Sequence, residues 1–97
     1  MDIKIQAINF EISDRLYTFV QKKAARIARR FPNLTDIDVN LTVERPESPV
    51  NKQAVVRLIE PHKSDKVATK TADTFEEAVD QCFAALEPQL EKNKVKN

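Results

Sequence analysis

The chain has 97 residues and a mass of 11.1 kDa, enough for one domain with one hydrophobic core. Apolar residues make up 41% and charged residues 32%, a balance that excludes a disordered chain. No apolar run reaches the roughly 18 residues that a transmembrane helix needs, and residues 1–12 lack the pattern of a signal peptide. The single cysteine, Cys82, excludes an internal disulfide. We therefore expect a small cytoplasmic domain.

The composition also argues against an enzyme. The chain has no glycine, so it cannot build a phosphate-binding loop or a dinucleotide-binding turn. One histidine, His62, and one cysteine cannot form a closed zinc site. We expect a binding protein with no cofactor, no metal and no small-molecule substrate.

The first two elements are a strand and a helix. Alternating apolar and polar residues predict a half-buried strand over 3–7. Ser13 stands where the N-cap of a helix is expected, Pro32 ends that helix, and Asn33 is expected to adopt a left-handed cap. The apolar stripe of this helix comprises Leu16, Val20, Ala24, Ile27 and Phe31.

Three further strands follow. Strict alternation predicts a strand over 37–43 with a polar, solvent-facing side. Two prolines mark residues 45–52 as a loop. Residues 54–59 and 67–71 are the next strands, and 61–66 form the hairpin connection between them.

A second helix completes the domain. Thr74 and Glu77 have the spacing of a capping box, and the helix is expected to run to about residue 91, with a kink or a frayed last turn at Pro88. Its apolar stripe comprises Phe75, Val79, Cys82, Leu86 and Leu90, which makes the cysteine a buried core residue. We expect a single domain over 1–92 and a flexible basic tail over 93–97.

The predicted order is therefore β-α-β-β-β-α. A right-handed parallel crossover joins the first two strands, and hairpins join the others. Each helix has one apolar stripe and the sheet one apolar face. The expected fold is α+β, a two-layer sandwich with a four-stranded mixed sheet and both helices on one face.

The formal net charge of +1 hides a strong segregation along the chain. Residues 13–31 carry six basic residues against Asp14, a local charge of +5, whereas residues 73–91 carry six acidic residues and no basic ones, a local charge of −6. A surface with mixed charges would serve solubility better than two separate regions of opposite charge.

The first helix presents its basic residues away from the apolar stripe. Such a face can contact several phosphates of a nucleic acid, with Phe19 beside it as an aromatic that either stacks on a base or packs under a loop. The alternative interpretation is a solvated helix surface. The face comprises Arg15, Lys22, Arg26, Arg29 and Arg30, and Lys23 flanks the apolar stripe.

The second helix has an acidic face formed by Glu76, Asp80, Glu87 and Glu91. It is interpreted as a solvated surface, with early acidic residues suited to the helix dipole, or as a face that orients the molecule on RNA by charge repulsion. The alternative function for the chain is a protein-interaction regulatory module that uses this face to dock a basic partner.

Several motifs resemble the ribosome hibernation-promoting factors, also known as ribosome-associated translation inhibitors. The resemblance runs from I-x-I-x-A-x-N-F-E-I-S-D-R-L at 3–16 and F-V-x-K-K at 19–23 to D-V-N-L-T-V-E at 38–44. It continues in T-F-E-E-A-V-D at 74–80 and L-E-P-Q-L-E-K at 86–92. No motif is specific alone, but their order and spacing cover nearly the whole chain.

The resemblance implies a fold related to double-stranded RNA-binding domains and a non-enzymatic role. The expected partners are the small ribosomal subunit, the whole ribosome and rRNA, which the protein would bind in the mRNA and tRNA channel to silence translation on idle ribosomes under stress. The length resembles the short form of the family, which does not pair ribosomes by itself; whether a helper protein does so stays open. The expected RNA contacts are Lys22, Lys23, Arg26, Arg29, Arg30 and Lys92.

The second helix departs from the family pattern. Glu76 replaces an aromatic residue, and Ala85 and Pro88 stand where the family places Lys and Arg. These departures predict a weaker contribution of the second helix to rRNA contact than the family pattern implies.

Overall fold

The computed structural model describes residues 1–95 and has the predicted order of elements. The strands are β1 (Asp2–Ile8), β2 (Asp36–Val43), β3 (Lys52–Ile59) and β4 (Lys66–Ala72), and the helices are α1 (Asp14–Arg30) and α2 (Phe75–Val95). The strand order in the sheet is β1-β2-β3-β4, with β1 parallel to β2 and the other neighbours antiparallel. The β-α-β-β-β-α prediction and the mixed sheet are confirmed.

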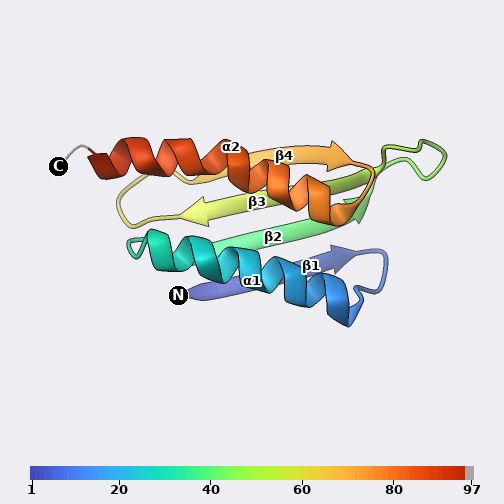
Figure 1. Ribbon diagram of the computed structural model, residues 1–97, viewed down its shortest axis with the longest axis horizontal. Helices are drawn as coiled ribbons and strands as arrows, with labels where there is room; N and C mark the ends of the chain where they lie inside the picture. Colours follow the sequence, from blue (N-terminus) through green and yellow to red (C-terminus); the bar gives the residue numbers. More distant parts are fainter. Residues whose placement is uncertain (96–97) are drawn as a thin grey trace.

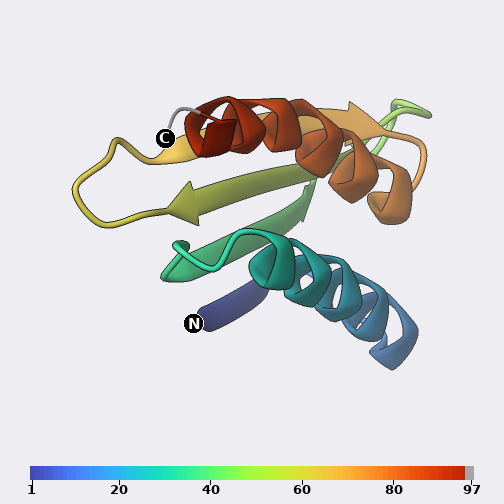
Figure 2. The ribbon, with the colours of Figure 1, turned by 60° about the vertical axis from the view of Figure 1, so that its left-hand side comes forward.

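Both helices cover one face of the sheet. They lie side by side and run in the same direction, with α1 in front of β1 and β2 and α2 in front of β3 and β4 (Figure 1). The view turned by 60° shows that the other face of the sheet carries no helix (Figure 2). The protein is therefore a two-layer sandwich with one open sheet face, as the alternation in β2 predicted.

The core lies between the helices and the sheet. Inward-facing residues of β2 and β3 are almost fully buried, and they meet the two apolar helix stripes. The buried set includes every residue of the two predicted stripes: Leu16, Val20, Ala24, Ile27, Phe31, Phe75, Val79, Cys82, Leu86 and Leu90. Burial of these stripes is the main force that holds both helices on the sheet.

Side-chain oxygens cap both helices at their N-termini. The backbone N–H of Leu16 donates to Ser13 Oγ at 3.1 Å, and that of Glu77 donates to Thr74 Oγ1 at 3.1 Å. Each bond satisfies one of the amide groups that the first turn leaves without an intrahelical partner. The two predicted N-caps are confirmed.

The predicted left-handed cap at Asn33 and the predicted frayed turn at Pro88 are wrong, and the alternative of a kink at Pro88 stays a prediction. In α1 the chain leaves the helix at Phe31 with φ −129°, and the left-handed residues among those described are Asn9 and His62, not Asn33. In α2 the helix continues through Pro88 to Val95, so its last turn does not fray there. A proline removes only one backbone hydrogen bond, and packing of Leu86 and Leu90 holds the helix on both sides of it. Of the predicted tail, residues 96–97 lie outside the described residues.

Candidate nucleic-acid interface

The exposed side of α1 carries the predicted basic face. Lys22, Arg26 and Arg29 are exposed, and among the described residues none of the three forms an ion pair. They occupy positions that are three or four residues apart, so their side chains lie on one side of the helix. Three positive charges without a protein counter-charge are thus presented together to solvent.

A hollow of about 390 Å³ lies among these side chains. Its lining comprises Phe19, Lys22, Lys23, Ala25, Arg26 and Arg29. The Phe19 ring is half-buried against the core, and Lys23 Nζ lies 5.8 Å from its centroid. Phe19 therefore acts mainly as a packing residue that forms the apolar floor of a basic hollow.

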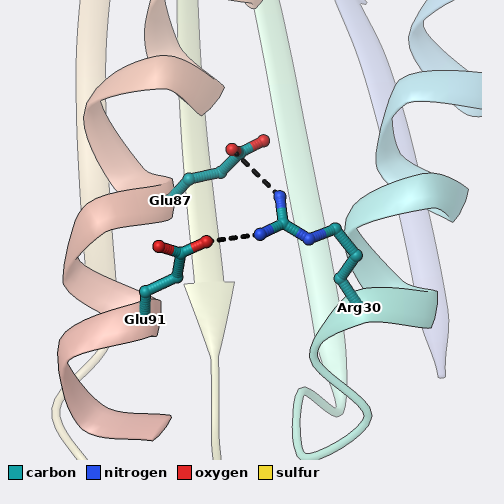
Figure 3. A network of polar contacts seen from close by, with 3 residues as sticks. All are labelled: Arg30, Glu87 and Glu91. Atoms are coloured by element: carbon teal, nitrogen blue, oxygen red, sulfur yellow. Dashed lines mark hydrogen bonds and ion pairs between the residues drawn. The ribbon is translucent and has the colours of Figure 1, made fainter. Parts of the chain in front are cut away.

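The other side of this basic face meets the acidic helix. Lys23 Nζ lies 2.6 Å from Asp80 Oδ1 across the groove between α1 and α2. The guanidinium of Arg30 donates to Glu87 Oε1 at 3.2 Å and also to Glu91 Oε2, so that one side chain bridges two turns of α2 (Figure 3). The segregated charges of the sequence are neighbours in space.

This pairing changes the interpretation of both helices. Asp80, Glu87 and Glu91 are not simply a solvated face, because each contacts a cation of α1. Only Glu76 of the predicted acidic face makes no such contact within residues 1–95. The sequence contained one signal of this arrangement, since Lys23 and Arg30 have the same spacing as Asp80 and Glu87.

Arg26 lies in the same groove but has no carboxylate partner among the described residues. A hollow of about 170 Å³ between the helices is lined by Lys23, Arg26, Ile27, Asp80, Phe83, Ala84 and Glu87. Ala84 occupies the α2 position between the turns of Asp80 and Glu87. The groove therefore has paired cations at both ends and an unpaired one between them.

The remaining predicted contact, Lys92, lies near the end of α2. Its side chain is exposed and forms no ion pair with any described residue. The structure does not bring it into contact with the cations of α1. It adds a separate positive charge beyond Glu91.

The open face of the sheet has mixed charge. Lys4, Asp38 and Arg57 are paired in register across β1, β2 and β3, and Arg57 also donates to Asp65 at 3.1 Å. Each cation there has a carboxylate nearby. This face lacks the excess of positive charge that distinguishes α1.

Within residues 1–95, no group of three or more metal-ligating side chains is found. No helix of that part of the chain is long and apolar enough to cross a membrane. A polyanion is the ligand that the exposed chemistry favours.

Comparisons with known proteins agree with the fold. A sequence model of the family described as "Sigma 54 modulation protein / S30EA ribosomal protein" matches residues 3–97. A ribosome hibernation promoting factor of Azotobacter vinelandii is 27% identical over 96 residues, which are 99% of this chain and 85% of that protein.

Two solved structures are also similar. A ribosomal subunit interface protein from Coxiella burnetii has a TM-score of 0.82 and 25% identity, over 99% of this chain and all of that one. The N-terminal domain of Thermus thermophilus Protein Y has a TM-score of 0.76 and 24% identity, over 95% of this chain and 98% of that one. The second likeness concerns the fold alone.

Proposed function

Because the chain belongs to the sigma 54 modulation protein / S30EA ribosomal protein family, whose members are non-enzymatic ribosome-associated factors, we propose that it silences translation on idle ribosomes. It binds small-subunit rRNA in the channel used by mRNA and tRNA. The observation that carries this proposal is the cluster of three unpaired cations on α1: Lys22, Arg26 and Arg29.

The cluster matches the chemistry of an RNA backbone. Arginine guanidinium groups bind phosphate oxygens through two parallel hydrogen bonds, and lysine adds a mobile point charge. Lys23, Arg30 and Lys92 are further proposed contacts, although the first two must leave their carboxylates to engage phosphate. Inhibition is steric, because a packed domain of this size occupies space that mRNA and tRNA require.

The function is tested with a triple charge reversal, Lys22→Glu with Arg26→Glu and Arg29→Glu. Co-sedimentation with purified small subunits and inhibition of translation in vitro are measured at low and high salt. The wild-type protein should bind and inhibit, less so at high salt, and the triple variant should do neither. All three side chains are exposed, so the melting temperature should change little.

The matched control is Lys4→Glu with Arg45→Glu and Lys70→Glu, which makes the same charge change at exposed cations away from α1. It should still bind small subunits. Normal binding by the α1 variant, or equal loss in both triple variants, would contradict the assignment of the site. Absence of wild-type binding even at low salt would contradict the function itself.

A further inference from the structure

The ion pairs between the helices place the carboxylates of α2 in competition with RNA phosphate. Lys23 and Arg30 each have a carboxylate within ion-pair distance, whereas Arg26, between them, has none in the part of the chain that the structure describes. A cation that is already paired has less to gain from a phosphate, because it must first give up its partner. The three groove cations are therefore not equivalent as RNA ligands.

We infer that Asp80, Glu87 and Glu91 compete with RNA phosphate for Lys23 and Arg30, so that Arg26 is the groove cation that phosphate binds without displacing a carboxylate. This inference rests on the proposed function and adds a set of residues that oppose RNA binding. Phosphate can bind Arg26 and the outer side of α1 directly, whereas binding to Lys23 or Arg30 must first displace a carboxylate.

The exposure of the pairs sets how strongly they compete. The side chains of Lys23 and Asp80 are 32% and 48% exposed, and those of Arg30 and Glu91 are 41% and 50% exposed. Exposed ion pairs of this kind shift an equilibrium by roughly 1.5- to 5-fold each. They lower the affinity for any RNA, and a correctly shaped site can still displace them by offering several phosphates at once.

Ala84 leaves the groove beside Arg26 without a carboxylate from this position of α2. It is exposed on α2 and lines the groove together with Arg26. A carboxylate at this position would face Arg26 as Asp80 faces Lys23. The small side chain therefore keeps the middle of the groove open to phosphate.

The test measures the affinity for purified small subunits across a series of KCl concentrations. Asp80→Asn removes one competitor, and Glu87→Gln with Glu91→Gln removes the other two. Each should bind several-fold more tightly than a variant with the same charge change elsewhere on α2, namely Glu76→Gln for the first and Glu76→Gln with Glu77→Gln for the second. The slope of log affinity against log salt should steepen by about one for each freed cation.

The opposite change is Ala84→Glu, which supplies a competitor for Arg26. It should weaken binding several-fold and make the salt slope shallower by about one, relative to Gln89→Glu on the same helix. In the background of Lys23→Gln, the gain from Asp80→Asn should disappear, because no cation is left to be freed. Circular dichroism confirms that each variant is folded.

Equal effects of the groove variants and their charge-matched controls would overturn the inference, because net charge alone would then explain them. A gain from Asp80→Asn that persists without Lys23 would do the same. In both cases wild-type binding still supports the proposed function. If no protein in the series binds small subunits, the function and the inference fall together.

Discussion

The ring of Phe10 lies parallel to that of Phe75, with centroids 4.9 Å apart and an interplanar angle of 7°. Phe10 belongs to the connection between β1 and α1, and Phe75 is the first residue of α2. The contact therefore joins the N-terminal ends of the two helices. The aromatic of the N-F-E-I motif is part of the scaffold that sets the helix pair, not of the RNA face.

A double-mutant cycle tests this contact. Phe10→Leu and Phe75→Leu should each lower the free energy of unfolding in urea, and the two changes should couple by about 0.5–1.5 kcal/mol because the ring interaction is lost only once. Phe10→Leu with Phe83→Leu, a pair that does not stack, is the control and should couple less. Equal coupling in both cycles would show that the ring contact contributes nothing of its own.

His62 gives a prediction about backbone conformation. It lies in the hairpin between β3 and β4 with φ 64°, in the left-handed region where a side chain costs about 1–2 kcal/mol. His62→Gly removes that cost but adds flexibility to the unfolded chain. The net result should be an increase of about 0.5–1 kcal/mol in the free energy of unfolding, measured with urea.

The control for this change is Ser64→Gly in the same hairpin. Ser64 is not among the described residues with positive φ, so only the loss from unfolded-state flexibility applies. Its free energy of unfolding should fall by about 0.4–1 kcal/mol. Destabilisation by both glycines would mean that the conformation of His62 carries no strain.

Cys82 gives a prediction about pH. Its side chain is fully buried, with Sγ donating to the carbonyl of Ala54 at 3.3 Å, and burial raises the pKa of the thiol above its ordinary value of 9.0. The thiolate, which is the reactive form, is therefore disfavoured in the folded protein. At pH 8 a thiol reagent should modify the native protein much more slowly than the urea-unfolded one.

The same shift affects stability. Well below pH 9 the thiol is protonated in both states, so it adds no pH dependence; as the pH rises through 9 the unfolded chain ionises while the folded one keeps its proton. The free energy of unfolding should therefore decrease as the pH rises above 9, and Cys82→Ala should remove this part of the decrease. Parallel pH profiles for the two proteins would contradict the assignment to Cys82.

Local pattern was enough to predict most of the fold. Alternation in residues 37–43 marked a strand that is buried on one side, and the stripes of both helices are buried as expected. These signals succeed because burial depends on the periodicity of each element. The helix ends were harder to predict. Asn33 is a residue type that can adopt a left-handed cap, and Pro88 one that can end a helix, but tertiary packing decides whether either does so, and here neither does.

The site was predicted only in part. Lys22, Arg26 and Arg29 lie together on the exposed side of α1, as the helical spacing indicated. That Lys23 and Arg30 meet Asp80, Glu87 and Glu91 depends on the parallel packing and relative register of two helices far apart in the chain. No periodicity within one helix encodes that register, so the charges were interpreted as two independent surfaces.

The parallel pairing of β1 with β2 has a consequence for the order of folding. Asp2 pairs with Asp36 and Ile8 with Thr42, so every pair in this ladder encloses the whole of α1. The β2-β3 and β3-β4 ladders close shorter loops and can form while β1 is still unpaired. Since β1 is also an edge strand with half-buried residues, its amides should exchange with solvent deuterium before those of β2 and β3. We therefore expect β1, which supports the basic helix, to pair after the β2-β3 ladder forms and to open before it.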